Sequence, residues 1–363
     1  MKPSIISKLH HVSQPILELL PLHWQVKLMS AGRQRFMKEF CLAMPEHNFI
    51  PDKKHAVTAW GLKFRTPLMN SAGMFKNGDG YDVVAALGAG GYIGGTSTAN
   101  PRIGNVRNAI HLPFVTLPSS SIAINWLGLP NLGDELLANM LITKRKLAGC
   151  PIGWSVMRSP DYTEEDGMQL LINSLWKYHN NPQIDFIEIN ESCPNIRAGG
   201  GNIINRLTMI SEKFLKQRKR PLPIIVKLSN DITYASLDEI LVAMIKLGFD
   251  GINLGNTSID YLKVKQALGK KDLPLFEYFT RNYGGGVSGV VLQKTSLNLC
   301  AHAANKVAQL IPDYEFHIIR SGGVQHVDSI QQSLQNGATL MQWYTGFFTN
   351  YNRYGENIYR ELF

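Results

Sequence analysis

The residues best suited to chemistry are Asn190, Cys193 and Asn195, which lie where a strand-like run opens into a loop. Residues 185–190 alternate between apolar and polar side chains as a β-strand does, and a proline and three glycines follow. A cysteine thiol, with a reference pKa of about 8.5, can remove a proton at neutral pH with modest help from its surroundings. Two alternatives stay open. Buried packing is the commoner role of cysteine, and a nucleophile would require a neighbouring histidine that this segment lacks.

Asparagines recur at the predicted strand ends, at Asn125, Asn190, Asn195 and Asn256. An amide offers both a donor and an acceptor to a planar polar ring, whereas an ionised carboxylate only accepts. An anionic substituent on such a ring would need a cation, for which Lys76 is the candidate. A single asparagine in such a place is usually a turn residue and a lone lysine is usually solvated, so only the whole set indicates a ligand.

Two glycine clusters follow the last two predicted strands, at Ser321-Gly322-Gly323 and Tyr344-Thr345-Gly346. In an eight-stranded α/β barrel these two loops form a recurrent phosphate site, because glycine lets backbone N–H groups approach the phosphate oxygens. The run from Gly284 to Gly289 is expected to join them. Each cluster taken alone is more often a turn, but together they predict a phosphate-bearing cofactor.

The elements that must position these residues follow a strand–helix rhythm. Eight strands are predicted to begin near residues 67, 91, 151, 185, 223, 249, 316 and 339. The clearest helices are predicted at 134–146, 167–178, 205–218, 236–247, 294–311 and 327–335. This alternation predicts the α/β class and a (β/α)8 TIM barrel, with a doubly wound open sheet as the alternative. Long connections at 96–149 and 255–293 are expected to cover the site.

Residues 1–50 differ from the remainder, being basic, poor in glycine and helix-like. We expect an N-terminal helical extension here, with Pro15 and Pro21 separating helices, and a barrel over residues 51–363. One interpretation is an amphipathic pair that lies on a membrane or forms the mouth of a hydrophobic tunnel. The other is that these helices only close one end of the barrel.

The composition excludes several classes of protein. The 363 residues are 44% apolar and 18% charged, which is typical of a globular chain. The four cysteines form no C-x-x-C pair, so neither a metal site nor a disulfide framework is predicted, and a reducing compartment is expected. A net charge of +9 suits anionic ligands or a membrane surface, but the basic residues are not interleaved with aromatics as nucleic-acid binding would favour.

Over roughly residues 57–350 the chain resembles the dihydroorotate dehydrogenase family. The motifs that carry this resemblance are Ser71-Ala72-Gly73 with Lys76-Asn77, Gly104-Asn105, Asn125 with Gly128, Asn190 through Asn195, Lys227, Asn256-Thr257, Gly286-Val287-Ser288-Gly289, Gly322-Gly323 and Tyr344-Thr345-Gly346. The resemblance implies an FMN-containing barrel that oxidises dihydroorotate to orotate in pyrimidine biosynthesis.

The resemblance also implies a role for each matching residue. Cys193 resembles the base that removes the C5 proton while hydride leaves C6 for the flavin. Lys227 resembles the cation beside the flavin ring, where positive charge favours the anionic reduced form. The residues that resemble the substrate contacts are Lys76, Asn125, Asn190, Asn195, Asn256 and Thr257. Those that resemble further FMN contacts are Ala72, Gly73, Thr96, Gly289, Gly322, Gly323, Tyr344 and Thr345.

The chain combines features of two classes of that family. Cys193 resembles the base of the soluble class, whereas Lys76 and the N-terminal extension resemble the membrane-bound class, which has a quinone tunnel. Gly95 stands where the soluble class keeps a lysine. Thr116 and Trp126 replace arginines of the membrane-bound class.

Two further departures concern the active site. Met157-Arg158-Ser159 replaces a usual flavin contact, and Glu191 puts an acid beside Asn190. Its side chain is expected either to face outward or to go with an altered substrate.

We therefore expect a quinone as electron acceptor, and a homodimer that is cytoplasmic or peripheral on the inner face of a membrane. One alternative is a related FMN oxidoreductase that uses fumarate or NAD, or that acts on another pyrimidine. Another alternative is a barrel that binds a flavin or a pyrimidine without catalysis.

Overall fold

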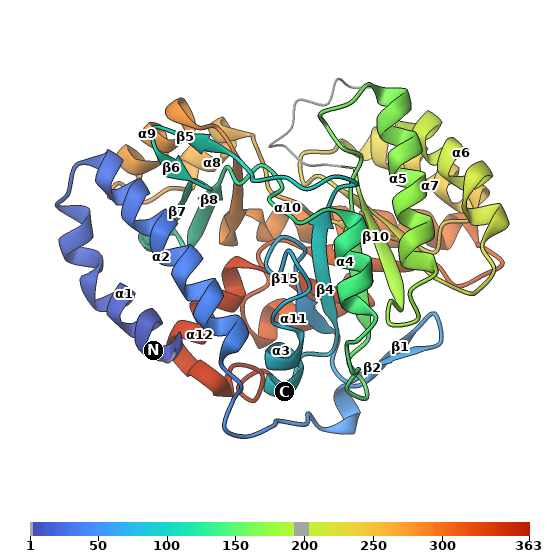
Figure 1. Ribbon diagram of the computed structural model, residues 1–363, viewed down its shortest axis with the longest axis horizontal. Coiled ribbons are helices and arrows are strands. Elements are labelled where there is room, and N and C mark those ends of the chain that lie inside the picture. The colour runs from blue at the N-terminus through green and yellow to red at the C-terminus, as the bar shows by residue number, and fades with distance from the viewer. Residues whose placement is uncertain (1–2, 192–202) are drawn as a thin grey trace.

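The computed structural model describes residues 3–191 and 203–363, and its centre is a barrel of eight parallel strands (Figure 1). These strands are β3 (Leu68–Asn70), β4 (Tyr92–Ser97), β9 (Ile152–Val156), β10 (Phe186–Asn190), β11 (Ile224–Leu228), β12 (Gly251–Leu254), β14 (His317–Ser321) and β15 (Leu340–Trp343). They pair in the order β3-β15-β14-β12-β11-β10-β9-β4, and parallel bridges such as that from Met69 to Gly91 close the ring. The predicted (β/α)8 barrel is confirmed.

Helices follow the strands around the outside of the barrel. They are α3 (Tyr81–Leu87), α4 (Asp134–Leu141), α5 (Glu164–His179), α6 (Ile203–Lys213), α7 (Tyr234–Leu247), α10 (Gln293–Leu310), α11 (Val327–Gln335) and α12 (Thr345–Tyr354). Short 3-10 turns are η1 (Lys53–His55), η2 (Pro118–Ser120), η3 (Leu215–Gln217), η4 (Val290–Leu292) and η5 (Gly355–Asn357). Thr163 and Thr233 cap α5 and α7 through their hydroxyls, as threonine does at N-caps. Helix α4 ends earlier than predicted, and the hydroxyl of Thr143 just beyond it bonds to the backbone of Met140.

The two long connections build a cover over the carboxyl ends of the strands. Its elements are β5 (Val106–Arg107), β6 (Ile110–His111), β7 (Phe114–Leu117), β8 (Ile122–Asn125), α8 (Tyr261–Gln266), α9 (Leu273–Asn282) and β13 (Gly286–Gly289). Strand β8 pairs antiparallel with both β7 and β13, so the two connections share one small sheet. Val115, Ile124, Val287 and Phe279 give this cover its own buried apolar cluster. The opposite end of the barrel carries a hairpin of β1 (Val57–Ala59) and β2 (Leu62–Phe64).

The N-terminal extension consists of α1 (Pro3–Glu18) and α2 (Leu22–Leu42), which lie beside α12 in Figure 1. The prediction that Pro15 separates two helices is wrong, because Pro15 lies inside α1. Proline removes one backbone donor, and the helix ends within one turn of it. Pro21 does separate the helices.

Helix α2 is built into the core of the protein. Phe40 is fully buried and packs its ring against those of Phe347 and Tyr351, with centroids 5.5 and 5.2 Å away. Helix α1 instead leaves Val12 and Ile16 exposed, by 74% and 66%. Over residues 3–191 and 203–363, no helix is both long enough and apolar enough to cross a bilayer.

Candidate active site

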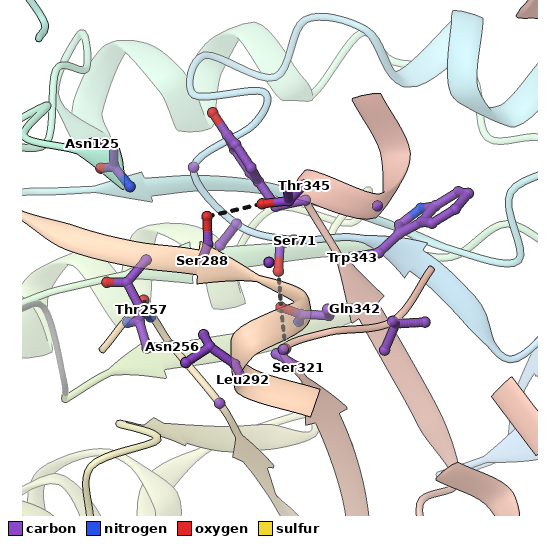
Figure 2. A pocket seen from close by; sticks show the side chains of 18 of the residues that line it. Ser71, Asn125, Asn256, Thr257, Ser288, Leu292, Ser321, Gln342, Trp343 and Thr345 are labelled. Carbon is purple, nitrogen blue, oxygen red and sulfur yellow. Dashed lines mark hydrogen bonds between the residues drawn. The ribbon is translucent and has the colours of Figure 1, made fainter. Parts of the chain in front are cut away.

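A cavity opens at the carboxyl ends of the barrel strands, beneath the small sheet of the cover (Figure 2). Every predicted site residue within the described part of the chain lines it: Ala72, Gly73, Lys76, Thr96, Asn125, Asn190, Lys227, Asn256, Thr257, Gly289, Gly322, Gly323, Tyr344 and Thr345. Cys193 and Asn195 fall outside the described residues. The barrel therefore gathers in one place residues that are spread over more than 270 positions of sequence, from Ala72 to Thr345.

The amides of the site are held by one another. Asn190 donates from Nδ2 to Thr96 Oγ1 at 3.2 Å, and its Oδ1 accepts from Asn256 Nδ2 at 3.2 Å. The backbone N–H of Thr257 donates to Asn256 Oδ1 at 2.8 Å. Asn125, on β8 of the cover, faces the cavity from above and donates to the carbonyl of Gly286 at 3.4 Å. Fixed amides of this kind present hydrogen-bonding groups in a set geometry.

Lys76 reaches the cavity next to Gly73. A Cβ added at Gly73 would lie 3.9 Å from Lys76 Nζ, and Gly73 has a φ of +94° that disfavours any other residue. That distance is an ordinary van der Waals contact, so the backbone conformation is what favours glycine here, and the ammonium group of Lys76 lies beside it at the wall of the cavity. This arrangement places a cation where it can form an ion pair with an anionic substituent of a ligand.

Below the asparagines, the inside of the barrel holds a buried polar network. Lys227 is 3% exposed and donates from Nζ to Gln342 Oε1 at 2.9 Å. Glu188 is fully buried and accepts at Oε2 from Gln342 Nε2 and from Asn253 Nδ2, both at 2.7 Å. Its other oxygen lies 3.5 Å from Lys227 Nζ. Ser321 and Ser71 add hydroxyl donors to the same network, as Figure 2 shows. The lysine is thus held in place by a charged and an amide partner.

Glu188, Asn253 and Gln342 were not among the predicted site residues. Glu188 and Asn253 lie two positions before the cavity residues Asn190 and Gly255, and alternate residues of a strand face the same side. Gln342 lies two positions before Tyr344 and itself lines the cavity. A polar residue two positions before a strand-end site residue was therefore the signal in the sequence. One level lower, Phe186, Ile225 and other apolar side chains fill the base of the barrel.

The end of the cavity formed by the loops after β14 and β15 suits a phosphate. A Cβ added at Gly346 would come within 2.1 Å of a backbone carbonyl oxygen, and one at Gly323 within 2.5 Å of the Gln293 backbone. The buried Nε2 donor of Gln325 has no hydrogen-bond partner in the structure. Ser288 and Thr345 place their hydroxyl oxygens 2.9 Å apart (Figure 2). Hydroxyl and amide donors, and backbone N–H groups that no side chain covers, are the groups that bind phosphate at helix N-termini. These residues therefore fit the predicted cofactor.

A second cavity, of about 350 Å³, lies between α1, α2 and the barrel. Its wall is mainly apolar, formed by Met29, Phe36, Phe114, Ile122 and Phe348 among others. Arg33 of α2 also lines it and donates from Nε to Tyr344 Oη at 2.9 Å. Tyr344 and Thr345 line both cavities. This pair of residues therefore separates a polar chamber from an apolar one.

Three of the departures in sequence, at Gly95, Thr116 and Trp126, have clear surroundings in the structure. A Cβ at Gly95 would lie 2.2 Å from the Ser155 carbonyl oxygen, so the backbone leaves no room for a side chain at this position. Thr116 lines the apolar cavity, and its hydroxyl faces the sulfur of Met29 at 3.9 Å. The ring of Trp126 lies 5.0 Å from the guanidinium of Arg107.

Glu191 does not line the cavity. Its carboxylate accepts from Nε and Nη2 of Arg206, on α6, at 3.0 and 2.8 Å. Burial raises the pKa of Glu191 above the ordinary carboxyl value, and the guanidinium of Arg206 opposes that rise. Of the two predicted alternatives, an outward-facing side chain or an altered substrate, the structure agrees with a side chain that faces away from the cavity. The acid therefore does not indicate an altered substrate.

Comparison with known proteins agrees with this geometry. Two relatives named dihydroorotate dehydrogenase (quinone) are each 28% identical to the chain. The relative from Aeromonas hydrophila aligns over 303 residues, 81% of this chain and 83% of its own length. The relative from Buchnera aphidicola aligns over 324 residues, 86% of this chain and 87% of its own. A crystal structure of DHODH from Eimeria tenella in complex with ferulenol superposes with a TM-score of 0.74 at 20% identity, covering 92% of this chain and 89% of that one.

The sequence profile of one family extends over the whole barrel. Residues 54–363 match the profile described as dihydroorotate dehydrogenase. This range contains every residue of the polar cavity. The chain belongs to the dihydroorotate dehydrogenase family.

Proposed function

We propose that this protein oxidises dihydroorotate to orotate with a bound FMN and passes the electrons to a quinone. The observation that carries the proposal is the convergence of the predicted ligand residues on one cavity of a family member. The names of the relatives support both the substrate and the acceptor.

When bound, FMN would supply a two-electron acceptor for the hydride that leaves C6 of dihydroorotate. The glycine loops after β14 and β15, at Gly322, Gly323 and the start of α12, would hold its phosphate. Lys227, fixed by Gln342 and Glu188, would bring a positive charge to the isoalloxazine, which favours the anionic reduced form. A buried and pre-oriented charge has this effect without reorganising during the reaction.

The chain's own residues orient the substrate and move the proton. Asn125, Asn190 and Asn256 hold the pyrimidine ring through its amide edges, and Lys76 binds its carboxylate. Asn195 and Thr257 complete the ring contacts. Cys193 takes the proton from C5. It is the cysteine that follows the strand-like run 185–190 in the sequence, and a thiol with a reference pKa of about 8.5 can act as a base with modest help from its surroundings.

The apolar cavity supports a quinone as the acceptor. It is large, mostly lined by apolar side chains, and in contact with the polar cavity through Tyr344 and Thr345. The exposed apolar residues Val12 and Ile16 of α1, with Leu19 just after it, would place its mouth against the inner face of a membrane, where quinones reside.

The test is a stopped-flow experiment in two stages. The purified protein should be yellow, and mixing it with dihydroorotate without oxygen should bleach the flavin. The reduced protein is then mixed in parallel with a short-chain quinone, with fumarate and with NAD. Fast reoxidation by the quinone alone is expected. Reoxidation only by fumarate or NAD would overturn the acceptor, and a flavin that stays oxidised with dihydroorotate would overturn the substrate.

A further inference from the structure

Arg320 is a fully buried arginine at the penultimate position of β14, directly before the glycine loop. Its guanidinium makes hydrogen bonds from all three nitrogens. Nε donates to Ser296 Oγ at 3.0 Å, and Nη1 donates to Ser333 Oγ at 2.6 Å. Nη2 donates to the carbonyls of Gly322 at 2.8 Å and of Gln293 at 3.3 Å. All of these acceptors are neutral.

No carboxylate in residues 3–191 or 203–363 forms an ion pair with this guanidinium. Arg102, Arg206 and Arg218, by contrast, do pair with acids. The nearby thiol of Cys300 supplies no charge, because burial raises its pKa to about 12. Desolvation lowers the pKa of Arg320 to about 10, which still leaves it charged at neutral pH. A buried cation without an anion is costly, so a compensating negative charge nearby would stabilise the fold.

The polar cavity begins one residue beyond this guanidinium. The carbonyl of Gly322 accepts from Arg320 and, at 2.8 Å, from Ser296 Oγ. In a planar trans peptide the N–H points opposite to the C=O, so anchoring this carbonyl on the guanidinium turns the N–H of Gly323 the other way. Both glycines line the cavity. The unpaired Nε2 of Gln325 lies at the same end. The arginine thus fixes the peptide whose N–H is available to a ligand.

We infer that Arg320 is a positioning residue for the phosphate of the cofactor. It lies behind the Gly322–Gly323 peptide and orients the N–H of Gly323 toward the phosphate. The negative charge of the phosphate in turn balances the buried charge of the guanidinium. This inference rests on the proposed flavin cofactor and deepens it. Arg320 does not line the cavity and acts through the loop. Its effect should therefore depend on the phosphate and leave the isoalloxazine and ribityl contacts unchanged.

The test compares two ligands that differ only in the phosphate. The full-length protein is stripped of flavin and titrated with FMN and with riboflavin, following the quenching of flavin fluorescence. For Arg320→Met, the affinity for FMN should fall by about tenfold or more, because a buried charge near the phosphate is lost, while the affinity for riboflavin changes by less than about twofold. For Arg320→Lys, which keeps the charge, the loss for FMN should be smaller.

Arg220 offers a matched control. It too is partly buried and donates to backbone carbonyls, those of His179, Asn181 and Ile184, but it lies away from the cavity. Arg220→Met should change the two affinities equally or not at all.

Three outcomes are decisive. Equal losses for FMN and riboflavin in Arg320→Met and Arg320→Lys would overturn the inference and leave a structural role. A wild-type protein that binds both flavins equally well would overturn it too, since the phosphate would then contribute nothing. A wild-type protein that binds neither flavin would instead contradict the proposed cofactor. If Arg320→Met does not fold, the comparison is made with Arg320→Lys, and thermal protection by inorganic phosphate should be weaker in this variant than in the wild-type protein.

Discussion

The two cavities of this protein share a wall but are built in opposite ways. In the polar cavity the side chains hold one another, as in the chain of hydrogen bonds from Thr96 through Asn190 to Asn256. In the apolar cavity most of the exposed wall is apolar, although polar residues such as Arg33, Gln14 and Asn352 also line it. The first cavity has its geometry set before any ligand arrives. The second is shaped by how two N-terminal helices lie on the barrel, and it suits a ligand recognised mainly by its apolar surface.

This difference assigns the two halves of the proposed reaction to two parts of the chain. The barrel and its cover supply the residues for proton and hydride removal, and the N-terminal helices supply most of the acceptor cavity. Substitutions in one cavity should therefore alter one half-reaction and spare the other. The predictions below test that separation, from the largest expected effect to the smallest.

Replacing the proposed base should give the largest effect. In Cys193→Ala, reduction of the flavin by dihydroorotate should slow by about 10²–10⁴-fold, which is the usual contribution of a general base. Reoxidation of chemically reduced flavin by a quinone should keep its wild-type rate. Stopped-flow absorbance measures both steps. Equal slowing of both steps would contradict the separation of the two cavities, and Cys150→Ala, a buried cysteine outside the site, is the control.

Breaking the buried ion pair beneath the site should strongly destabilise the barrel. In Glu188→Gln the buried Lys227 loses its anion, and the free energy of unfolding should fall by about 3–5 kcal/mol. Denaturation by urea measures this change. The matched control is Asp250→Asn, which breaks the more exposed pair with Arg218 and should cost less. A smaller loss for Glu188→Gln than for this control would show that the network does not need the charge.

Removing the cation of the apolar cavity should weaken the acceptor step only. In Arg33→Gln the hydrogen bond that holds Tyr344 at the wall of the apolar cavity is lost. The KM for quinone should rise by about tenfold, which is the size of effect expected when a hydrogen bond from a charged donor is removed. The rate of flavin reduction by dihydroorotate should stay unchanged. Lys27→Gln, on the same helix but outside the cavity, is the control. A slower flavin reduction in Arg33→Gln would mean that the substitution also alters the polar cavity, through Tyr344 and Thr345, which line both cavities.

Placing charge on the exposed apolar residues of α1 and of the turn that follows it should lower membrane binding without affecting either cavity. Val12, Ile16 and Leu19 are exposed by 74%, 66% and 86%. Replacing all three by glutamate should reduce cosedimentation with anionic vesicles by about tenfold, because each buried aliphatic side chain contributes about 1.5–3 kcal/mol. These substitutions are a sharper test than deleting residues 1–50, since the deletion would also uncover the core around Phe40.

The control for this experiment uses exposed apolar residues elsewhere. Glutamate at Leu136, Met140 and Ile311 adds the same charge on other faces and should leave cosedimentation unchanged. If the wild-type protein does not bind vesicles at all, the helices only cap the barrel.

The barrel and most of the cavity could be predicted from sequence because strand ends carry strong local signals. Glycines and asparagines at the ends of apolar runs located the loops, and the order of the strands located the phosphate end. Glu188 and Arg320 were missed because both lie inside strands, where a charged residue gives no indication of its neighbours. Arg33 was missed because its role depends on how α2 packs against Tyr344, which is a long-range contact.

Pro15 shows the limit of a purely local rule. The sequence rule treats proline as a helix boundary, but α1 continues through it. The helix continues for only three residues after Pro15, to Glu18, and it packs against α2 and α12.

The wall formed by Tyr344 and Thr345 has a consequence for inhibition. A compound that fills the apolar chamber touches this wall from one side only, so dihydroorotate can still enter from the other. Raising the concentration of dihydroorotate would then fail to displace such a compound, and its potency would be set by competition with the acceptor. Selectivity between this protein and its relatives would accordingly come from the N-terminal helices, whose sequence lies largely outside the stretch that defines the family.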